Sequence, residues 1–112
     1  MRVIVAGLAV AMWLVGGIAS AQDAKVQAGM KVYDAQKCAM CHSIAGKGNA
    51  KNPLDGVGAK LSDAQIKEWI VAPGDAAKKA SSTAKPPMKA YDKLPAADVD
   101  ALVAYMKSLN KK

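Results

Sequence analysis

The sequence predicts an all-α fold, and three observations support this prediction. Apolar residues repeat at helical spacing in three separate segments. No stretch alternates apolar and polar residues with the β-branched content of a strand. The chain has 112 residues, no Phe and two Trp, and domains this small are marginal without a metal, a disulfide or a cofactor. We therefore expect one domain whose helices surround a core that such a group completes.

The N-terminal segment has the three-part layout of a secretory signal peptide. A short positive start precedes an apolar run from Val3 to Ile18, and Ala19-Ser20-Ala21 is a small-x-small cleavage site before polar Gln22. We expect residues 1–21 to be removed, leaving 22–112 as the mature domain. The alternative is a retained membrane anchor, but the run is shorter than the ~20 residues of a spanning helix.

The first helix of the mature domain is expected from Lys25 to Lys37. Val26, Met30 and Tyr33 fall on one face, at spacings of four and three residues. Gly29 lies inside this helix, where glycine costs up to ~1 kcal/mol relative to Ala. Such a glycine indicates that another backbone approaches closely.

The second helix, Ser62 to Ala72, has signals at both ends. Ser62 can cap its start, and Gln65 stands three residues later as the second member of a capping box. Pro73-Gly74 ends the helix. The sequence therefore predicts both boundaries.

The third helix is expected from Ala96 to Asn110, where apolar residues repeat at helical spacing: Val99, Leu102, Val103, Met106 and Leu109. Loops are expected over Gly46 to Gly58 and over Ser81 to Met88. Ala76 to Ala80 can form one further helical turn.

The pentapeptide Cys38-Ala39-Met40-Cys41-His42 carries the chemistry. Thiols three residues apart on a short helical turn point the same way and can reach the two vinyl groups of one porphyrin. The imidazole of the next residue can then bind the iron. In an exported chain this spacing is typical of covalent c-type haem attachment, with one haem c as the cofactor.

Other uses of the two cysteines are weaker explanations. Two Cys and one His are too few for a four-cysteine iron–sulfur cluster or a closed zinc site. A thioredoxin-type dithiol needs a strand–helix context that this sequence lacks. A disulfide between Cys38 and Cys41 would close a very short loop and add little stability.

The sixth iron ligand has to come from a methionine, from another weak ligand or from none, because His42 is the only histidine. Met40 lies within the attachment motif, while Met30 and Met106 lie on helical core stripes, where Met usually fills gaps. Met88 follows Pro86-Pro87 in a loop, where the prolines stiffen the backbone. We predict Met88 as the axial ligand, with an exposed loop methionine as the alternative.

The formal charge of +7 falls to +6 once Arg2 is removed with the signal peptide. The remaining basic residues are lysines spread along the chain, without the clustered Arg and stacking aromatics of nucleic-acid binding. They form either an ordinary solvated surface or a positive face that steers an acidic protein partner.

The order of these landmarks resembles that of a small monohaem class I c-type cytochrome of the bacterial periplasmic type. The matching residues are Gly29, Tyr33, the attachment pentapeptide, Asn52-Pro53-Leu54, Met88, Leu102 and Tyr105. The resemblance covers essentially the whole mature chain. It implies a class I cytochrome c fold, with three to five helices around one covalently bound haem and with crossing N- and C-terminal helices.

The resemblance also implies roles for individual residues. Gly29 would be the point where the first helix crosses the face formed by Leu102 and Tyr105. Pro53 matches the residue whose carbonyl accepts a hydrogen bond from the far nitrogen of the iron-ligating imidazole, a contact that raises ligand basicity. Trp69 occupies the place of an aromatic residue beside the methionine side of the haem, with simple core packing as the alternative.

His/Met ligation would fill both axial positions, which leaves outer-sphere electron transfer as the chemistry. The expected function is a periplasmic electron carrier without enzymatic activity and without membrane insertion after cleavage. Near the presumed haem edge stand Lys47, Lys85, Lys89 and Lys93, which would favour weak, salt-sensitive docking to redox proteins with acidic surfaces. The alternatives are a haem c subunit of a periplasmic oxidoreductase complex, or a five-coordinate haem that binds small ligands or acts on peroxide.

Overall fold

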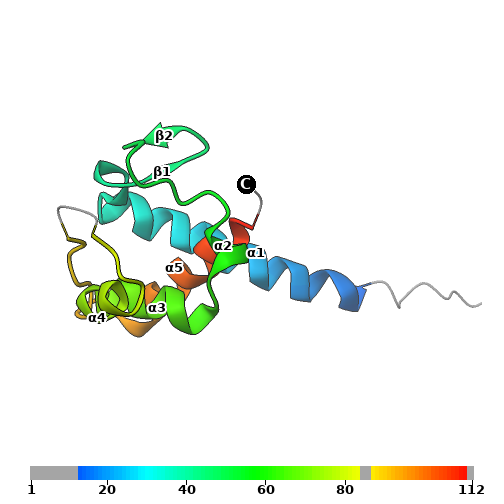
Figure 1. Cartoon of the computed structure of the whole chain (residues 1–112). Coiled ribbons are helices and arrows are strands. Elements are labelled where there is room, and N and C mark those ends of the chain that lie inside the picture. The colour runs from blue at the N-terminus through cyan, green and yellow to red at the C-terminus, as the bar shows by residue number, and fades with distance from the viewer. Residues whose placement is uncertain (1–12, 84–86, 111–112) are drawn as a thin grey trace, which may run out of the picture.

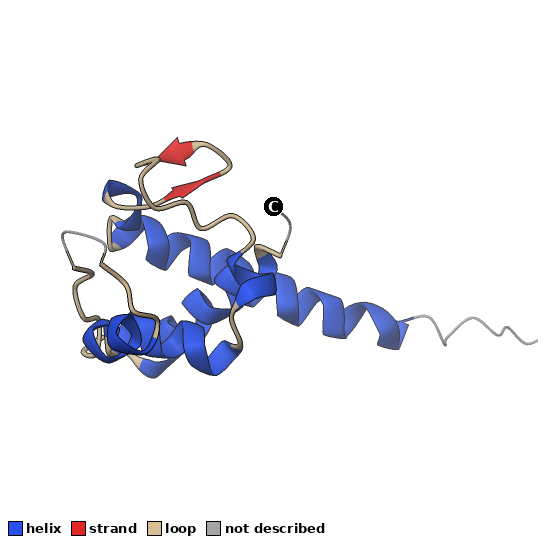
Figure 2. Ribbon diagram, viewed as in Figure 1, coloured by secondary structure: helices blue, strands red, loops and turns tan. Residues whose placement is uncertain are grey.

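The computed structural model describes residues 13–83 and 87–110, with side chains from Asp23 onward. Along the chain the elements are α1 (Trp13–Ala35), the 3-10 turn η1 (Cys38–Met40), β1 (Ser43–Ile44), β2 (Lys47–Gly48), α2 (Val57–Lys60), α3 (Asp63–Val71), α4 (Pro73–Lys79) and α5 (Ala96–Ser108) (Figure 1). Helices dominate this part of the chain (Figure 2). The predicted all-α fold of three to five helices is therefore confirmed.

One small sheet corrects the prediction that the chain contains no strands. β1 and β2 pair in antiparallel register, with Ser43 opposite Gly48 and Ile44 opposite Lys47. The two residues between the strands, Ala45 and Gly46, both have positive φ, 53° and 82°, as the turn of a two-residue hairpin requires. Strands of two residues are too short to show an alternating pattern, so they could not be predicted from the sequence.

Helix α1 begins well before the predicted start at Lys25. It runs without a break from Trp13 to Ala35, so the predicted cleavage point between Ala21 and Gln22 falls inside it. The residues before Trp13 lie outside the described range. The early start has a local cause, since alanine and glutamine around the predicted cleavage point favour helix. Among the described residues, no helix combines the length and the apolar character needed to cross a membrane.

Helices α1 and α5 cross in direct backbone contact at Gly29. A Cβ built on Gly29 would overlap the Ala101 carbonyl oxygen and would lie 2.7 Å from the Cβ of Tyr105. The Tyr33 and Tyr105 rings pack edge to face beside this crossing, with centroids 5.6 Å apart. The prediction that Gly29 marks the crossing of the N- and C-terminal helices is confirmed.

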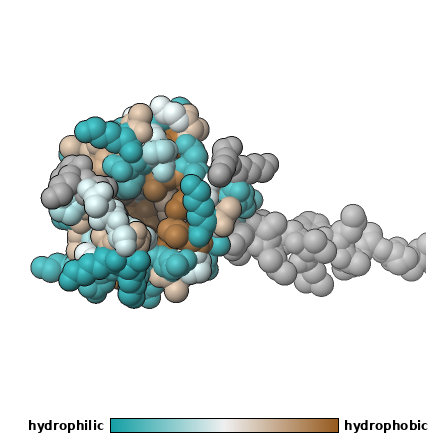
Figure 3. Space-filling view, viewed as in Figure 1, coloured by the Kyte–Doolittle hydropathy of each residue, from teal (hydrophilic) through white to brown (hydrophobic). Residues whose placement is uncertain are grey.

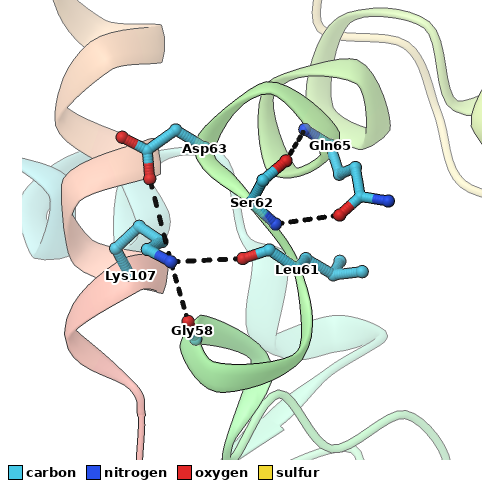
Figure 4. A network of polar contacts seen from close by, with 6 residues as sticks. All are labelled: Gly58, Leu61, Ser62, Asp63, Gln65 and Lys107. Atoms are coloured by element: carbon cyan, nitrogen blue, oxygen red, sulfur yellow. Dashed lines mark hydrogen bonds and ion pairs between the residues drawn. The ribbon is translucent and has the colours of Figure 1, made fainter.

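A second close approach, which the sequence did not reveal, joins α2 to the end of α5. The Gly58 amide donates to the Leu109 carbonyl at 2.8 Å, and a Cβ at Gly58 would meet the Met106 carbonyl oxygen at 2.8 Å. The half-buried Lys107 amine donates to the carbonyls of Gly58 at 2.9 Å and Leu61 at 3.3 Å (Figure 4). These bonds satisfy carbonyls at the end of α2 that have no partner within the helix.

Helix α3 starts and stops where the sequence predicts. Ser62 is its N-cap, and both bonds of the capping box are present: the Gln65 amide donates to Ser62 Oγ, and the Ser62 amide donates to Gln65 Oε1 (Figure 4). Pro73 ends α3 and also serves as the first residue of α4, a position where its missing N–H costs nothing. The single turn predicted over Ala76 to Ala80 is thus the second half of a longer helix.

The hydrophobic core is thin. Its buried side chains come from α1, α3 and α5, and they are Tyr33, Ile66, Ile70, Val99, Leu102 and Met106. Among the described residues no large side chain is less than 2% exposed. Protein side chains alone therefore leave this core incomplete.

Candidate functional site

A large cavity opens at the centre of the molecule, against the thin core. Its volume is about 790 Å³, within the range of roughly 300–1,000 Å³ that is usual for cofactor sites. Figure 3 shows a hollow with apolar residues at its floor and polar residues around its rim. All six residues predicted to form the site line this cavity: Cys38, Cys41, His42, Pro53, Trp69 and Met88.

The attachment segment turns sharply as α1 ends. Lys37 adopts the left-handed conformation, with φ 57° and ψ 39°, which directs the chain into the 3-10 turn. The amides of Cys41 and His42 both donate to the Cys38 carbonyl, at 3.1 and 3.0 Å. This single turn brings both thiols to the wall of the same cavity.

The two cysteines form no disulfide in this structure, and the Cys38 thiol lacks the lowered pKa of a redox-active dithiol. Both cysteines are free, with Cys41 exposed and Cys38 half-buried. Burial is the main cause that raises the pKa of the Cys38 thiol to about 11. A redox-active dithiol needs a lowered pKa, so that the thiolate can attack.

Two asparagines from the following loop hold the attachment segment in place. The Asn49 side chain donates to the Met40 carbonyl and the Asn52 side chain donates to the Cys41 carbonyl, each at 3.0 Å. The Asn49 backbone amide also bonds to the His42 carbonyl at 2.9 Å. The resemblance named Asn52 only as part of the Asn52-Pro53-Leu54 match, and no sequence pattern pointed to either side-chain bond, because the partners are carbonyls that every residue carries.

The imidazole of His42 is oriented by a backbone carbonyl. Its Nδ1 lies 3.1 Å from the carbonyl oxygen of Asn52. A carbonyl can only accept, so Nδ1 carries the proton and the lone pair lies on Nε2, the nitrogen left to bind a metal. This corrects the prediction for Pro53, whose carbonyl was expected to be the acceptor. Pro53 instead lines the cavity and pairs with Ser43 in an isolated parallel bridge.

The methionines differ in their access to the cavity. Met88 is half-buried in the loop before α5 and lines the cavity. Met30 is 41% exposed and Met40 is 70% exposed, and neither lines it. Met106 also reaches the cavity, but from within a helix as part of the packed core. Of the predicted Pro86-Pro87 pair, only Pro87 lies in the described range, and it lines the cavity next to Met88.

The structure describes three of the four lysines predicted to lie near the haem edge. Lys47, Lys89 and Lys93 are exposed, and of these three Lys89 lines the cavity. Lys85 lies outside the described residues. Two further lysines at the cavity wall, Lys37 and Lys60, were not among the predicted ones.

Two observations test whether a large prosthetic group fits this cavity. Within the described part of the chain, one buried side-chain polar atom has no hydrogen-bond partner, the Tyr33 hydroxyl, and Tyr33 lines the cavity. Burial raises the pKa of this hydroxyl to about 12. The described residues contain no group of three His, Cys, Asp or Glu side chains able to hold a bare metal ion. A prosthetic group in the cavity would lie beside the Tyr33 hydroxyl and would bring its own metal ligands, so it fits both observations.

Two thiols and an imidazole at the wall of a cofactor-sized cavity, within a helical fold, define a c-type haem protein. A family model described as Cytochrome c matches residues 26–110. The chain belongs to the cytochrome c family and is an electron-transfer protein with covalently attached haem c. Comparisons with curated proteins and with solved structures gave no match.

Proposed function

We propose that this protein is a periplasmic electron carrier that shuttles single electrons through one haem c, held by Cys38 and Cys41 and ligated by His42 and Met88. The observation that carries the proposal is that both thiols, the imidazole and the thioether line one cavity. Membership of the cytochrome c family supports it as well.

Each of these residues has a distinct part in the mechanism. Haem c supplies a one-electron Fe(III)/Fe(II) couple when bound. The Cys38 and Cys41 sulfurs would hold the group as thioethers, which would keep it in place in both oxidation states. His42 presents Nε2, because its Nδ1–H is held by the Asn52 carbonyl. The Met88 thioether favours ferrous iron and so raises the reduction potential.

The cavity wall contributes by excluding water. Ile66, Ile70 and Leu102 line it from two helices, and this apolar surface disfavours the additional positive charge of the ferric state. Trp69 lies half-buried on the same wall. Because the same side chains serve both oxidation states, little has to reorganise when an electron moves.

The ligand assignment is tested by Met88→Ala, with Met30→Ala as the matched control. Oxidised wild-type protein should show the far-red sulfur-to-iron charge-transfer band, and reduced protein should bind carbon monoxide slowly. Met88→Ala should lose the band and bind carbon monoxide rapidly. Met30→Ala should behave like wild type, because Met30 is 41% exposed and does not line the cavity. A band that survives Met88→Ala would assign the sixth position to another residue.

Docking through lysines is the second part of the proposal. Lys89 lines the cavity and stands exposed, so its charge lies where a partner would approach the haem edge. We expect oxidation by ferricyanide, an anion, to slow as ionic strength rises, and to slow further in Lys89→Glu. Lys25→Glu, an exposed lysine on α1 that does not line the cavity, is the control. Equal effects of the two variants would argue against a directed positive face.

Export is the third part. Cleavage between Ala21 and Gln22 would release a periplasmic domain of residues 22–112. The mass of the protein recovered from the periplasmic fraction of its host should equal that of 22–112 plus one haem. A mass that includes residues 1–21 would instead indicate a retained N-terminal segment.

A further inference from the structure

Asn52 touches the attachment segment with both its side chain and its backbone. Its Nδ2 donates to the Cys41 carbonyl at 3.0 Å, and its carbonyl accepts from His42 Nδ1 at 3.1 Å. The same carbonyl accepts from the Ser43 amide at 3.3 Å. One residue thus contacts three consecutive residues around the imidazole.

The position of Asn52 is constrained from its C-terminal side as well. Pro53 follows, and a residue before proline is restricted to extended backbone conformations. The Leu54 amide then donates to the Ser43 carbonyl at 2.8 Å. These contacts limit the directions in which the Asn52 carbonyl can point, and the side-chain bond to the Cys41 carbonyl adds a further restraint next to the imidazole.

We propose that Asn52 is the positioning residue of the iron-ligating imidazole: its carboxamide anchors it to Cys41 so that its own carbonyl is held at His42 Nδ1. This inference rests on the proposed function, because it concerns the strength of the His42–iron bond. A well-placed carbonyl fixes the tautomer and makes the imidazole a more basic ligand, which favours the ferric state and lowers the reduction potential.

The side chain is the part that a substitution can remove, since every residue supplies the carbonyl. In Asn52→Ala the anchor to Cys41 is lost, the carbonyl keeps only its backbone restraint from the Ser43 amide, and the Nδ1–H bond weakens. Complete loss of such an orienting partner typically costs ~10–100-fold in metal affinity or activity. With the carbonyl still present, we expect a shift of about three- to tenfold in the ferric-to-ferrous ratio at fixed potential. This corresponds to a rise of about 28 to 59 mV for a one-electron couple.

The chain offers a matched control in Asn49→Ala. Asn49 makes the same kind of bond at the same length, 3.0 Å, to the neighbouring Met40 carbonyl, but its own carbonyl does not meet the imidazole. A purely structural effect on the attachment segment would therefore appear in both variants. An effect on the imidazole would appear in Asn52→Ala alone.

The experiment measures the holoprotein, with the midpoint potential from spectroelectrochemistry and the exchange rate of the His42 Nδ1 proton from NMR. Asn52→Ala should raise the potential and speed the exchange, and Asn52→Gln, which keeps a carboxamide, should restore at least half of both changes. Asn49→Ala should change the ferric-to-ferrous ratio by less than twofold. If Asn52→Ala does not acquire haem, Asn52→Ser, with a polar side chain too short to reach Cys41, replaces it.

Two results would overturn the inference: equal shifts in Asn52→Ala and Asn49→Ala, or an unmoved potential and exchange rate in the Asn52 variants with haem attached. Failure of the proposed function would look different. In that case the wild-type protein itself would have the mass of the bare peptide, or would lack a His-ligated haem spectrum.

Discussion

Replacing Gly29 with alanine tests the helix crossing on which the fold depends. The new Cβ would lie 2.7 Å from the Tyr105 Cβ, whereas ordinary van der Waals contact begins at 3.4 Å. The helices would have to separate by about 0.7 Å at least. The Ala101 carbonyl is also in the way, and a backbone group cannot turn aside as a side chain can. Separation of this size forfeits a quarter to a half of the dispersion energy of each affected contact.

The expected magnitude follows from two opposing terms. Overpacking typically costs ~1–3 kcal/mol, and the upper end applies here because the clash involves backbone. Alanine gains about 1 kcal/mol over glycine in helix propensity. The net loss in the free energy of unfolding should therefore be about 2 kcal/mol, which is a fall of roughly 8–16 °C in Tm for a domain of this size.

The assay is urea unfolding of the holoprotein, followed by far-ultraviolet circular dichroism. Ala28→Gly is the control, because Ala28 is an exposed neighbour on α1 and measures the propensity term alone, with an expected loss of ~1 kcal/mol. The packing argument would be refuted if Gly29→Ala proved more stable than wild type by about the propensity gain.

Three further predictions concern the contact between α2 and α5, the cofactor and pH. Lys107→Met should cost about 1.5–3 kcal/mol in urea unfolding through the lost bonds to two carbonyls. Asp63→Asn should cost under ~1 kcal/mol, because its carboxylate is exposed and 4.0 Å from the Lys107 amine. Equal losses in the two variants would contradict the view that Lys107 stabilises the protein mainly through the two carbonyls. Changing Cys38 and Cys41 together to serine should give a colourless chain that loses most of its helical circular dichroism, because the core is incomplete without the haem; retained helicity would contradict this. Tyr33 has a pKa raised from 10.0 to about 12, so the folded state keeps a proton that the unfolded state loses. The free energy of unfolding should therefore fall as pH rises from 10 towards 12, and this fall should be smaller in Tyr33→Phe. If urea unfolding shows the same fall in both proteins, the buried Tyr33 hydroxyl is not its cause.

Local signals in the sequence were enough to predict the parts of the fold that depend on neighbouring residues. The apolar spacing predicted α3 and α5, and the Ser62–Gln65 pair predicted a capping box that the structure contains in full. Gly29 inside a helix predicted a close approach of another backbone, and the resemblance to class I c-type cytochromes named the C-terminal helix as its partner. These features succeed because each is a property of a few adjacent turns, and each has a strong local cause.

Features that depend on distant residues could not be predicted in the same way. The acceptor for the His42 ring was placed one residue too late, because no pattern in the chain distinguishes the carbonyl of Asn52 from that of Pro53. The role of Lys107 at the end of α2 was missed because its partners are backbone carbonyls 46 and 49 residues away. The β1–β2 hairpin was missed because it is two residues long on each side.

The sequence by itself indicated the class of this protein, because two thiols and an imidazole at this spacing, within a chain whose large side chains are few, predict a covalently attached prosthetic group. Only the tertiary structure decided which residues surround that group. Met88, Trp69 and Cys38 meet at one cavity because α1 and α5 cross at a glycine, and α3 then packs across α5. The physical reason is the distance along the chain over which each cause acts. The spacing of the attachment motif and the helical period act within a few residues, whereas the cavity wall forms from surfaces that helix packing brings together from distant parts of the chain.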